Sequence, residues 1–367
     1  VKRQLVSDVP VGAFLSGGID SPLVVSKMVD AGHTSLKAFT IATGEADSDE
    51  TRDARKYAEA FGVEQIVEEI NYDQALKFLP EVIEACSEPL GDYSIFPTML
   101  VSRLASKEFK VMLSGDGGDE LFWGYPQRSA DVIANASDFR MPLWVRRVRS
   151  GVRTALGRGT APSLAQPTIG DWYATRHTCL KNGWFERIFP GTQPVTDLLD
   201  GFRFAGSDSD ETAQWVRYNE FVYHLTMVLL KVDRASMHCS QEVRVPLLDK
   251  EVIEAASMVD WNSCLAIKTR TGKQPLRQIL ARRANYQSQR KMGFEAPMGS
   301  WLRGPLREQF ESLVMGREHI FDHRIDRKEM NRLWKIHQSG ERDFAFGLWP
   351  VLSLALWENA HFSRRAT

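Results

Sequence analysis

The sequence has 367 residues, with 46 Lys and Arg against 47 Asp and Glu and a formal net charge of -1. That length suits one large domain or two ordinary ones, and 43% hydrophobic with 25% charged residues excludes a disordered chain. The balanced charge argues against a general nucleic-acid binder, and no apolar run reaches the roughly 18 residues that cross a bilayer. We therefore expect neither a nucleic-acid nor a membrane partner.

The cysteines stand far apart, without the paired spacing of a zinc site or a redox motif. They are interpreted as reduced structural thiols of a cytoplasmic protein: Cys86, Cys179, Cys239 and Cys264. The sequence begins with Val1 and with a pattern typical of the middle of a helix, so we expect that further residues precede it.

The first third of the sequence alternates short apolar β-type runs with helical patterns. We expect strands at residues 11–15, 36–42, 65–70 and 111–113, and helices at 22–31, 48–61, 72–85 and 97–109. Such alternation predicts an α/β fold with a parallel twisted sheet flanked by helices. Ligands of such sheets bind beyond the carboxyl ends of the strands.

The later sequence is mostly helical from residue 211 onward, and residues 346–357 are typical of a buried core helix. Residues 138–165 differ, because they hold six arginines with no acidic residue between them. A nucleic-acid patch is one interpretation, but the neutral chain favours a solvated helix face or a docking surface. Glycine, proline and serine in residues 157–170 predict a mobile loop.

A glycine loop follows the first predicted strand, with the sequence SGGIDS at residues 16–21. Gly17 and Gly18 would let the backbone approach a ligand, and amides at the next helix N-terminus would point at an anion. Ser16 and Ser21 add hydroxyl donors, whereas Asp20 suits a phosphate site only if Mg²⁺ bridges the two. The alternative is a plain turn with a capping serine. The pattern is neither a Walker A loop nor GxGxxG.

A second glycine loop follows the fourth predicted strand, with the sequence SGDGGDE at residues 114–120. Its crowded acids, Asp116, Asp119 and Glu120, need a cation, and the spacing of an EF-hand is missing. Because parallel strands bring both loops to one edge, Asp119 and Asp20 could share one Mg²⁺. The alternative is a solvated acidic turn.

These motifs carry a resemblance to known families. The first loop resembles the pyrophosphate loop of the N-type ATP pyrophosphatases. Further motifs resemble the bacterial long form of the glutamine-hydrolysing asparagine synthetases: SGDGGDELF at 114–122, KVDRASM at 231–237, EVRVPLLD at 242–249, RKMGF at 290–294 and WLRGPL at 301–306. The resemblance implies an adenine nucleotide alpha hydrolase-like core at residues 1–126, a variable arginine-rich insertion at 127–210 and a helical part at 211–367.

The resemblance also implies roles for single residues. ATP and pyrophosphate would contact Leu15, Ser16, Gly17, Gly18, Asp20, Ser21, Ile41, Ser114 and Gly115, and Asp20 and Asp119 would hold Mg²⁺. The implied catalytic residues are Asp116, Lys273 and Lys291, and the implied substrate contacts are Glu120, Arg234 and Arg244. Read without the family, each lysine would be a surface residue. Arg234 and Arg244 could equally form structural ion pairs.

The implied function is ATP-dependent amide formation. The side chain of aspartate would be adenylated with release of pyrophosphate, and ammonia would then displace AMP to give asparagine. The full-length family carries a glutaminase domain with an N-terminal cysteine. This sequence has no counterpart, since its first cysteine is Cys86 between acidic neighbours that would raise a thiol pKa. We expect it to use free ammonia unless that domain or a partner supplies it, and we consider a homodimer.

Three alternatives remain open. The first is the same adenylation on another acid, namely a sugar acid, a peptide or a β-lactam precursor. The second is an inactive binding module, and the third is a tRNA-thiolating pyrophosphatase. The last is disfavoured by the missing cysteine pair. Two departures from the family pattern also matter. Pro22 stands where Ser or Thr is usual, and Trp123 replaces a usual Gly and is a candidate to narrow the pocket mouth.

Overall fold

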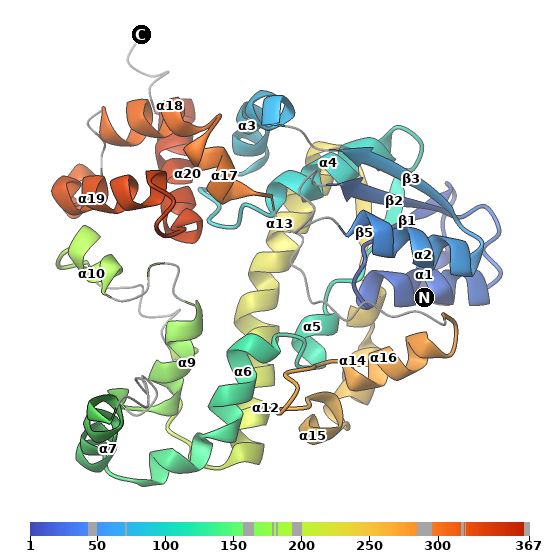
Figure 1. Ribbon diagram of the computed structural model, residues 1–367. Helices are drawn as coiled ribbons and strands as arrows, with labels where there is room; N and C mark the ends of the chain where they lie inside the picture. Colours follow the sequence, from blue (N-terminus) through green and yellow to red (C-terminus); the bar gives the residue numbers. More distant parts are fainter. Residues whose placement is uncertain are drawn as a thin grey trace.

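A parallel sheet forms the centre of the computed structural model, which describes residues 1–42, 50–69, 72–156, 165–177, 180, 183–192, 200–284, 296–316, 319 and 321–362. Side chains of residues 72–76 are not described. Within these ranges the sheet has five strands in the order β3-β2-β1-β4-β5 (Figure 1). The strands are β1 (Val11–Phe14), β2 (Lys37–Ala42), β3 (Glu64–Glu69), β4 (Val111–Leu113) and β5 (Glu242–Arg244). The predicted α/β class is confirmed.

Four of the strands lie where the sequence predicts them, and β5 is an addition. It pairs in parallel with β4, Leu113 standing opposite Arg244, and forms one edge of the sheet. Glu242 and Arg244 are charged and Val243 is half-buried against one core, so the strand has no fully buried side chain. A short polar edge strand lacks the buried apolar run that marks β1 and β4.

The sheet separates two hydrophobic cores, since side chains of a strand alternate between its faces. Phe39 and Ile41 face one core with Met112, and Ala38 and Leu113 face the other. The helices of this half are α1 (Asp20–Asp30), α2 (Thr51–Phe61), α3 (Tyr72–Ala85), α4 (Ile95–Ser106) and α5 (Gly118–Leu121). In Figure 1, α1 and α2 cover one face, and α4 with α13 lies on the other.

The remaining helices surround this centre. They are α6 (Pro126–Ala134), α7 (Leu143–Ala155), α9 (Ile169–His177), α10 (Trp184–Ile188), α12 (Ser209–Asn219), α13 (Leu225–His238), α14 (Lys250–Ser257), α15 (Trp261–Cys264), α16 (Gln274–Ala281), α17 (Met298–Arg303), α18 (Arg307–Phe310), α19 (Arg327–Gln338) and α20 (Ala345–His361). A π-helical turn, η3 (Glu220–His224), joins α12 to α13.

Helix α20 confirms the predicted core helix, with Leu348, Trp349 and Leu352 fully buried. Trp349 Nε1 donates to the carbonyl of Leu90 at 3.0 Å, which fixes α20 to the loop before α4. None of the helices in the described ranges is long and apolar enough to cross a membrane.

Candidate active site

The first glycine loop leaves β1 and curls onto its own side chains. The N–H of Ser16 donates to Ser21 Oγ at 2.9 Å, and the N–H of Gly18 donates to Ser16 Oγ at 3.2 Å. The Gly17 N–H donates to Glu50 Oε2 at 3.1 Å, so a loop amide already holds an anionic oxygen. A Cβ on Gly17 would lie 2.9 Å from the carbonyl oxygen of Glu50, which explains why this position is glycine.

The second loop packs directly on the first through its glycines. A Cβ on Gly115 would lie 2.5 Å from the Ser21 nitrogen, and one on Gly118 would lie 2.3 Å from Asp20 Oδ1. Gly117 has a φ of 91°, a conformation that glycine adopts without strain. Because glycine has no Cβ, the turns of the two loops that carry the carboxylates can meet at the edge of the sheet.

Lys273 lies between the two carboxylates that this contact brings together. Its Nζ is 2.6 Å from Asp119 Oδ1 and also forms an ion pair with Asp20. The lysine side chain is buried, and the backbone N–H of Lys273 donates to the Phe122 carbonyl at 3.0 Å. Burial acts to lower the pKa of Lys273, but the charges of Asp119 and Asp20 raise it well above its ordinary value. The side chain is therefore a fixed cation.

The carboxylate pair fits a divalent cation in part. Asp20 and Asp119 converge on one positive charge, and Mg²⁺ commonly takes one or two carboxylates together with phosphate oxygens. Across the described ranges, no group of three or more His, Cys, Asp or Glu side chains has the arrangement of a metal site. The pair would thus complete its ligand set from a bound phosphate rather than from further protein groups.

Glu120 is a second kind of acid beside this pair. It lies in the first turn of α5, is 2% exposed and accepts a hydrogen bond from Tyr125 OH at 2.7 Å. Burial and the neighbouring charge of Asp119 raise the pKa of Glu120 to about 7. A carboxyl group of this kind can exchange a proton near neutral pH. We call Asp20, Asp119, Glu120 and Lys273 the loop cluster.

Comparison with known proteins identifies the family of this chain. The family model for Asparagine synthase matches residues 1–359. This chain belongs to the asparagine synthase family. The family supports the expected class of enzyme, a carbon–nitrogen ligase.

Three relatives illustrate the family's range. A Mycobacterium tuberculosis protein, named as a provisional asparagine synthetase [glutamine-hydrolyzing], is 30% identical over 366 residues, covering 97% of this chain and 55% of its own. Asparagine synthetase [glutamine-hydrolyzing] 1 of Bacillus subtilis is 28% identical over 379 residues, covering 100% and 58%. Amidase chry2 of Gibberella zeae is 23% identical, covering 86% and 53%. The chain spans about half the length of the curated relatives it matches.

The structure also describes the surroundings of other residues that the asparagine synthase resemblance singles out. Asp116 is half-buried and accepts from Ser114 Oγ at 2.8 Å. Leu15 and Ile41 are buried, and the N–H and carbonyl of Leu15 bond to Phe39 and Thr40. Their contacts with a nucleotide stay predictions.

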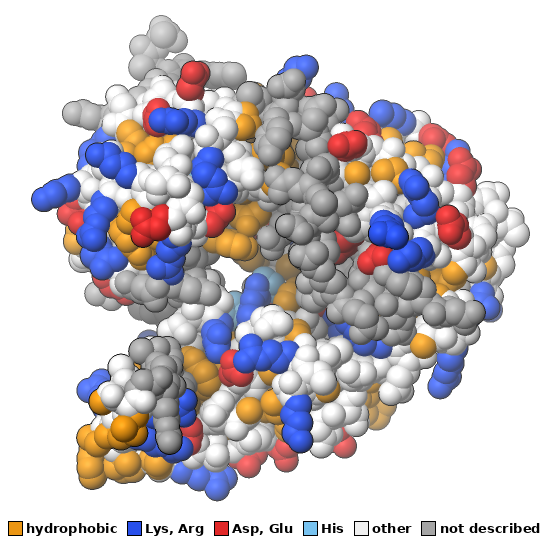
Figure 2. Space-filling model, in the orientation of Figure 1, with side chains coloured by type: hydrophobic (Ala, Val, Ile, Leu, Met, Phe, Trp, Pro, Cys, Tyr) orange, Lys and Arg blue, Asp and Glu red, His pale blue; other side chains and the backbone are white. Residues whose placement is uncertain are grey.

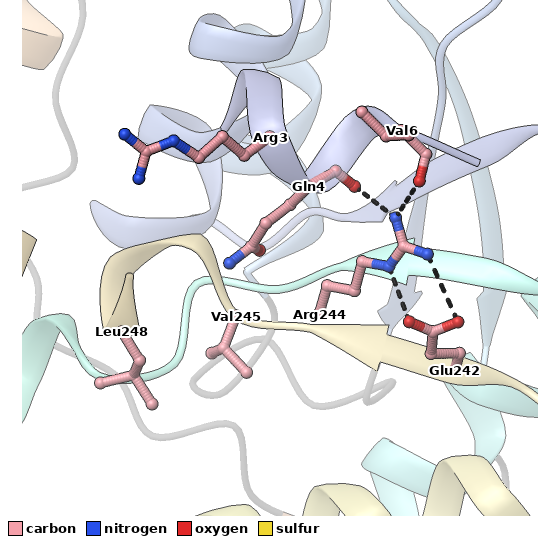
Figure 3. Close-up of a pocket in the computed structure, with 7 residues that line it drawn as sticks. All are labelled: Arg3, Gln4, Val6, Glu242, Arg244, Val245 and Leu248. Atoms are coloured by element: carbon pink, nitrogen blue, oxygen red, sulfur yellow. Dashed lines mark hydrogen bonds and ion pairs between the residues drawn. The ribbon is translucent and has the colours of Figure 1, made fainter. Parts of the chain in front are cut away.

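Arg244 bonds to the N-terminal segment and to its own strand, β5. Its guanidinium donates to the carbonyls of Gln4 and Val6 at 2.7 and 2.8 Å and pairs with Glu242 (Figure 3). Beside it is a hollow of about 560 Å³ lined by Arg3, Gln4, Val6, Glu242, Arg244, Val245 and Leu248. The geometry favours the structural alternative, in which Arg244 ties β5 to the N-terminal segment, over substrate binding.

Arg234 and Lys291 have different outcomes. Arg234 is half-buried on α13, where its charge reaches Cys86. Burial raises the pKa of that thiol to about 11, so desolvation rather than an acidic neighbour is the main cause of the raised pKa. Lys291 and the rest of the RKMGF motif lie outside the described residues. Their roles stay predictions.

The contacts of Trp123 in the described part of the chain are with the protein interior, and its narrowing of a pocket mouth stays a prediction. Trp123 is 3% exposed, and its Nε1 donates to the Ala213 carbonyl of α12 at 2.9 Å. Its φ of 50° is the left-handed conformation that the usual glycine would adopt without strain. Packing against α12 compensates for that strain. Pro22 lies in the first turn of α1, where its missing N–H costs nothing.

Two neighbours of the site are absent from the sequence-based list. Glu50 reaches the first loop across 33 positions, and Tyr125 reaches Glu120 across five. Neither spacing belongs to a motif with its own chemistry. Tyr125 does follow the second loop directly, which is the one local signal that could have pointed to it.

A second charged cluster, built around the buried Glu220 and Tyr173, lies on the helices beyond Tyr125. Glu220 of η3 accepts from Tyr173 OH, lies 3.4 Å from His177 Nε2 and lies 3.6 Å from Arg128 Nη1. Arg128 is also 3.3 Å from His224 Nε2, and the His224 ring stacks edge-on against Tyr125. Burial lowers the pKa of His224 to about 4. We call Arg128, Tyr173, His177, Glu220 and His224 the helix cluster.

Proposed function

We propose that this chain is the synthetase part of an ATP-dependent amide ligase, which activates the side-chain carboxylate of aspartate and transfers ammonia to it. The observation that carries the proposal is the meeting of two glycine loops around Asp20, Asp119 and Lys273. The family match over residues 1–359 supports the same reaction class.

The proposed reaction has two steps. A carboxylate oxygen attacks the α-phosphorus of ATP, and the bond to the β-phosphate oxygen breaks to release pyrophosphate. Ammonia then attacks the acyl carbon, loses a proton, and AMP leaves with one of the original carboxylate oxygens. Because no covalent bond to the protein forms, the chain contributes positioning and charge.

Each group of the site has a task in this scheme. The amides of residues 16–18 would bind phosphate oxygens, in the place where Gly17 now donates to Glu50. Lys273 would supply fixed positive charge, and Asp116 or Glu120 would take the proton from the attacking ammonia. Mg²⁺ held by Asp20 and Asp119 would neutralise phosphate charge. Lys291 is proposed to stabilise the leaving pyrophosphate.

The ammonia source and the organisation of the chain are part of this proposal. Asparagine synthetase relatives named as glutamine-hydrolysing are about twice as long, so a glutaminase domain would supply ammonia to the complete protein. Within this chain we propose an ATP-binding core at residues 1–126, a variable insertion at 127–210 and a helical part at 211–367. A homodimer and a cytoplasmic location stay predictions.

A second acceptor deserves a direct test, because the family match extends to fungal proteins named amidases at 23–24% identity. The same adenylation could act on a different acid. Such a change would keep the loop cluster and alter only the residues that contact the acceptor.

The deciding experiment uses aspartate labelled with ¹⁸O in its side-chain carboxylate, together with Mg·ATP and ammonium chloride. We expect pyrophosphate, asparagine, and AMP that carries one labelled oxygen, detected by mass spectrometry. Unlabelled ADP and phosphate would contradict the proposal. Pyrophosphate release with a different acid, and none with aspartate, would reassign the acceptor. The matched controls are Lys273→Met, which should lose the reaction, and Lys268→Met at an exposed position, which should keep it.

A further inference from the structure

Helix α7 (Leu143–Ala155) and its C-cap residue, Leu156, expose a row of large apolar side chains to solvent. Trp144, Val148, Val152 and Leu156, which we call the α7 stripe, are 70%, 61%, 53% and 64% exposed. Their spacing of four residues places them along one face of the helix. Figure 2 shows hydrophobic side chains gathered at the corner of the molecule where Figure 1 places α7. An amphipathic helix normally turns such a face toward the protein core.

The helix is attached to the protein by its polar side instead. Arg146 is the buried side chain of α7, and it donates to the carbonyls of Met141, Gln166 and Pro167 at 3.1, 2.7 and 2.8 Å. Arg146 precedes Val148 by two residues, which places it about 160° around the helix from the centre of the stripe. This anchor holds the apolar face outward.

Arginines border the stripe on both sides. Arg147 and Arg149 lie about 100° to either side of Val148, and Arg153 continues the second border. We call these three residues the α7 rim. All three are exposed, and the sequence contains no acidic residue from Phe139 through Leu156. The nearest acid, Asp138, pairs with Arg149 at 3.2 Å.

The charge of the rim decides which occupant the stripe suits. A second copy of α7 laid against the first would bring the two rims together, and like charges would repel. An anionic surface removes that conflict, because guanidinium groups bind phosphate oxygens. A basic rim around a tryptophan-containing apolar stripe is the pattern of helices that lie in the headgroup region of a bilayer.

We propose that α7 binds the surface of a membrane containing anionic phospholipids, with the stripe between the headgroups and the rim on their phosphates. This contact is peripheral and needs no spanning helix. It is independent of the ligase proposal, since α7 lies apart from the loop cluster (Figure 1). The docking surface that the arginine-rich sequence predicts would then face lipid.

Flotation of the whole chain with vesicles tests the proposal. We expect binding to vesicles of equal parts phosphatidylcholine and phosphatidylglycerol, little binding to phosphatidylcholine alone, and weaker binding as salt is raised. Arg147→Gln with Arg149→Gln should lower the partition constant about thirtyfold, at about fivefold for each arginine. Trp144→Ser with Val148→Ser should lower it at least about tenfold.

Matched variants elsewhere separate this surface from general effects. Arg324→Gln with Arg332→Gln makes the same charge change at exposed positions, and Val6→Ser with Met258→Ser removes apolar side chains that are 76% and 79% exposed. These controls should bind as the parent does, and all variants should keep its thermal midpoint. The proposal is overturned if anionic vesicles are not bound or the controls lose binding equally. A dimer in solution that the Trp144→Ser, Val148→Ser variant abolishes would assign the stripe to a second copy instead.

Discussion

The loop cluster and the helix cluster are both charged and partly buried, but their described ion pairs differ. Among the described residues, Lys273 of the loop cluster pairs with Asp20 and Asp119, and its charge also reaches Glu120. In the helix cluster a single carboxylate, Glu220, meets Arg128, His177 and a tyrosine hydroxyl. Burial acts to raise the pKa of Glu220, but its basic neighbours hold that pKa below its ordinary value.

The difference indicates what each cluster is for. A cluster of ion pairs can serve structure alone, whereas two carboxylates that converge on one point also suit a divalent cation. The loop cluster also lies beside amides suited to phosphate, so a cation arriving with ATP would satisfy both. The backbone amides beside it, rather than burial or charge as such, distinguish the candidate active site from its neighbour.

Replacing Lys273 should have the largest effect. In Lys273→Met the two aspartates lose their shared cation, and we expect pyrophosphate release to fall about a hundred- to a thousandfold. Mg²⁺ without nucleotide should raise the thermal midpoint of this variant more than that of the parent, because the ion takes the vacated place. Unchanged turnover, with Lys268→Met as the control, would show that Lys273 is structural.

The helix cluster should respond in stability instead. Glu220→Gln removes the charge that Arg128 and His177 face, and we expect the free energy of unfolding to fall by about 3 kcal/mol. Urea unfolding measures it, with exposed Glu254→Gln as a control expected to change little. Pyrophosphate release by the folded variant should stay near that of the parent. A large loss of turnover would instead join the two clusters into one functional unit.

Glu120 should make stability depend on pH. Its folded pKa of about 7 lies above the ordinary 4.5, so the folded state holds a proton that the unfolded state has lost. The contribution of this neutral carboxyl group to the free energy of unfolding is therefore fully present below pH 4.5, and it is lost as the pH rises through 7. The Glu120→Gln variant keeps a side-chain oxygen that can accept the hydrogen bond from Tyr125 OH, and it has no carboxyl group whose ionisation lowers the stability. Its thermal midpoint should gain on that of the parent between about pH 5 and pH 8, measured without Mg²⁺ or nucleotide. A constant difference would contradict the assignment.

The smallest effect should come from Glu50. Its carboxylate accepts the Gly17 N–H that a phosphate oxygen would need, so binding ATP must break this contact. Glu50→Gln weakens the contact by removing its charge, and we expect the KM for ATP to fall about threefold with little change in kcat. Glu59→Gln on the exposed side of α2 is the control. A rise in KM would mean that Glu50 shapes the loop for ATP.

The sequence predicted the parts of this molecule that depend on local pattern. Apolar runs marked four strands, and glycine loops marked the turns that carry Asp20 and Asp119. What it could not supply was set by long-range packing. Lys273 reaches Asp20 across 253 positions, and Arg244 is diverted by carbonyls near the other end of the chain. Such contacts leave no periodic trace in one sequence.

The π-helical turn η3 has a consequence for the angular setting of α13. Such a turn holds one residue more than an α-helical turn, so every later side chain is rotated about 100° from an uninterrupted helix. Under this rotation, Lys231 Nζ reaches Ser94 Oγ at 2.9 Å, and Asp92 lies 3.6 Å away. Deleting one residue from 220–224 would swing Lys231 off α4 while leaving the rod helical. The extra residue of η3 thus determines which face of α13 packs against α4.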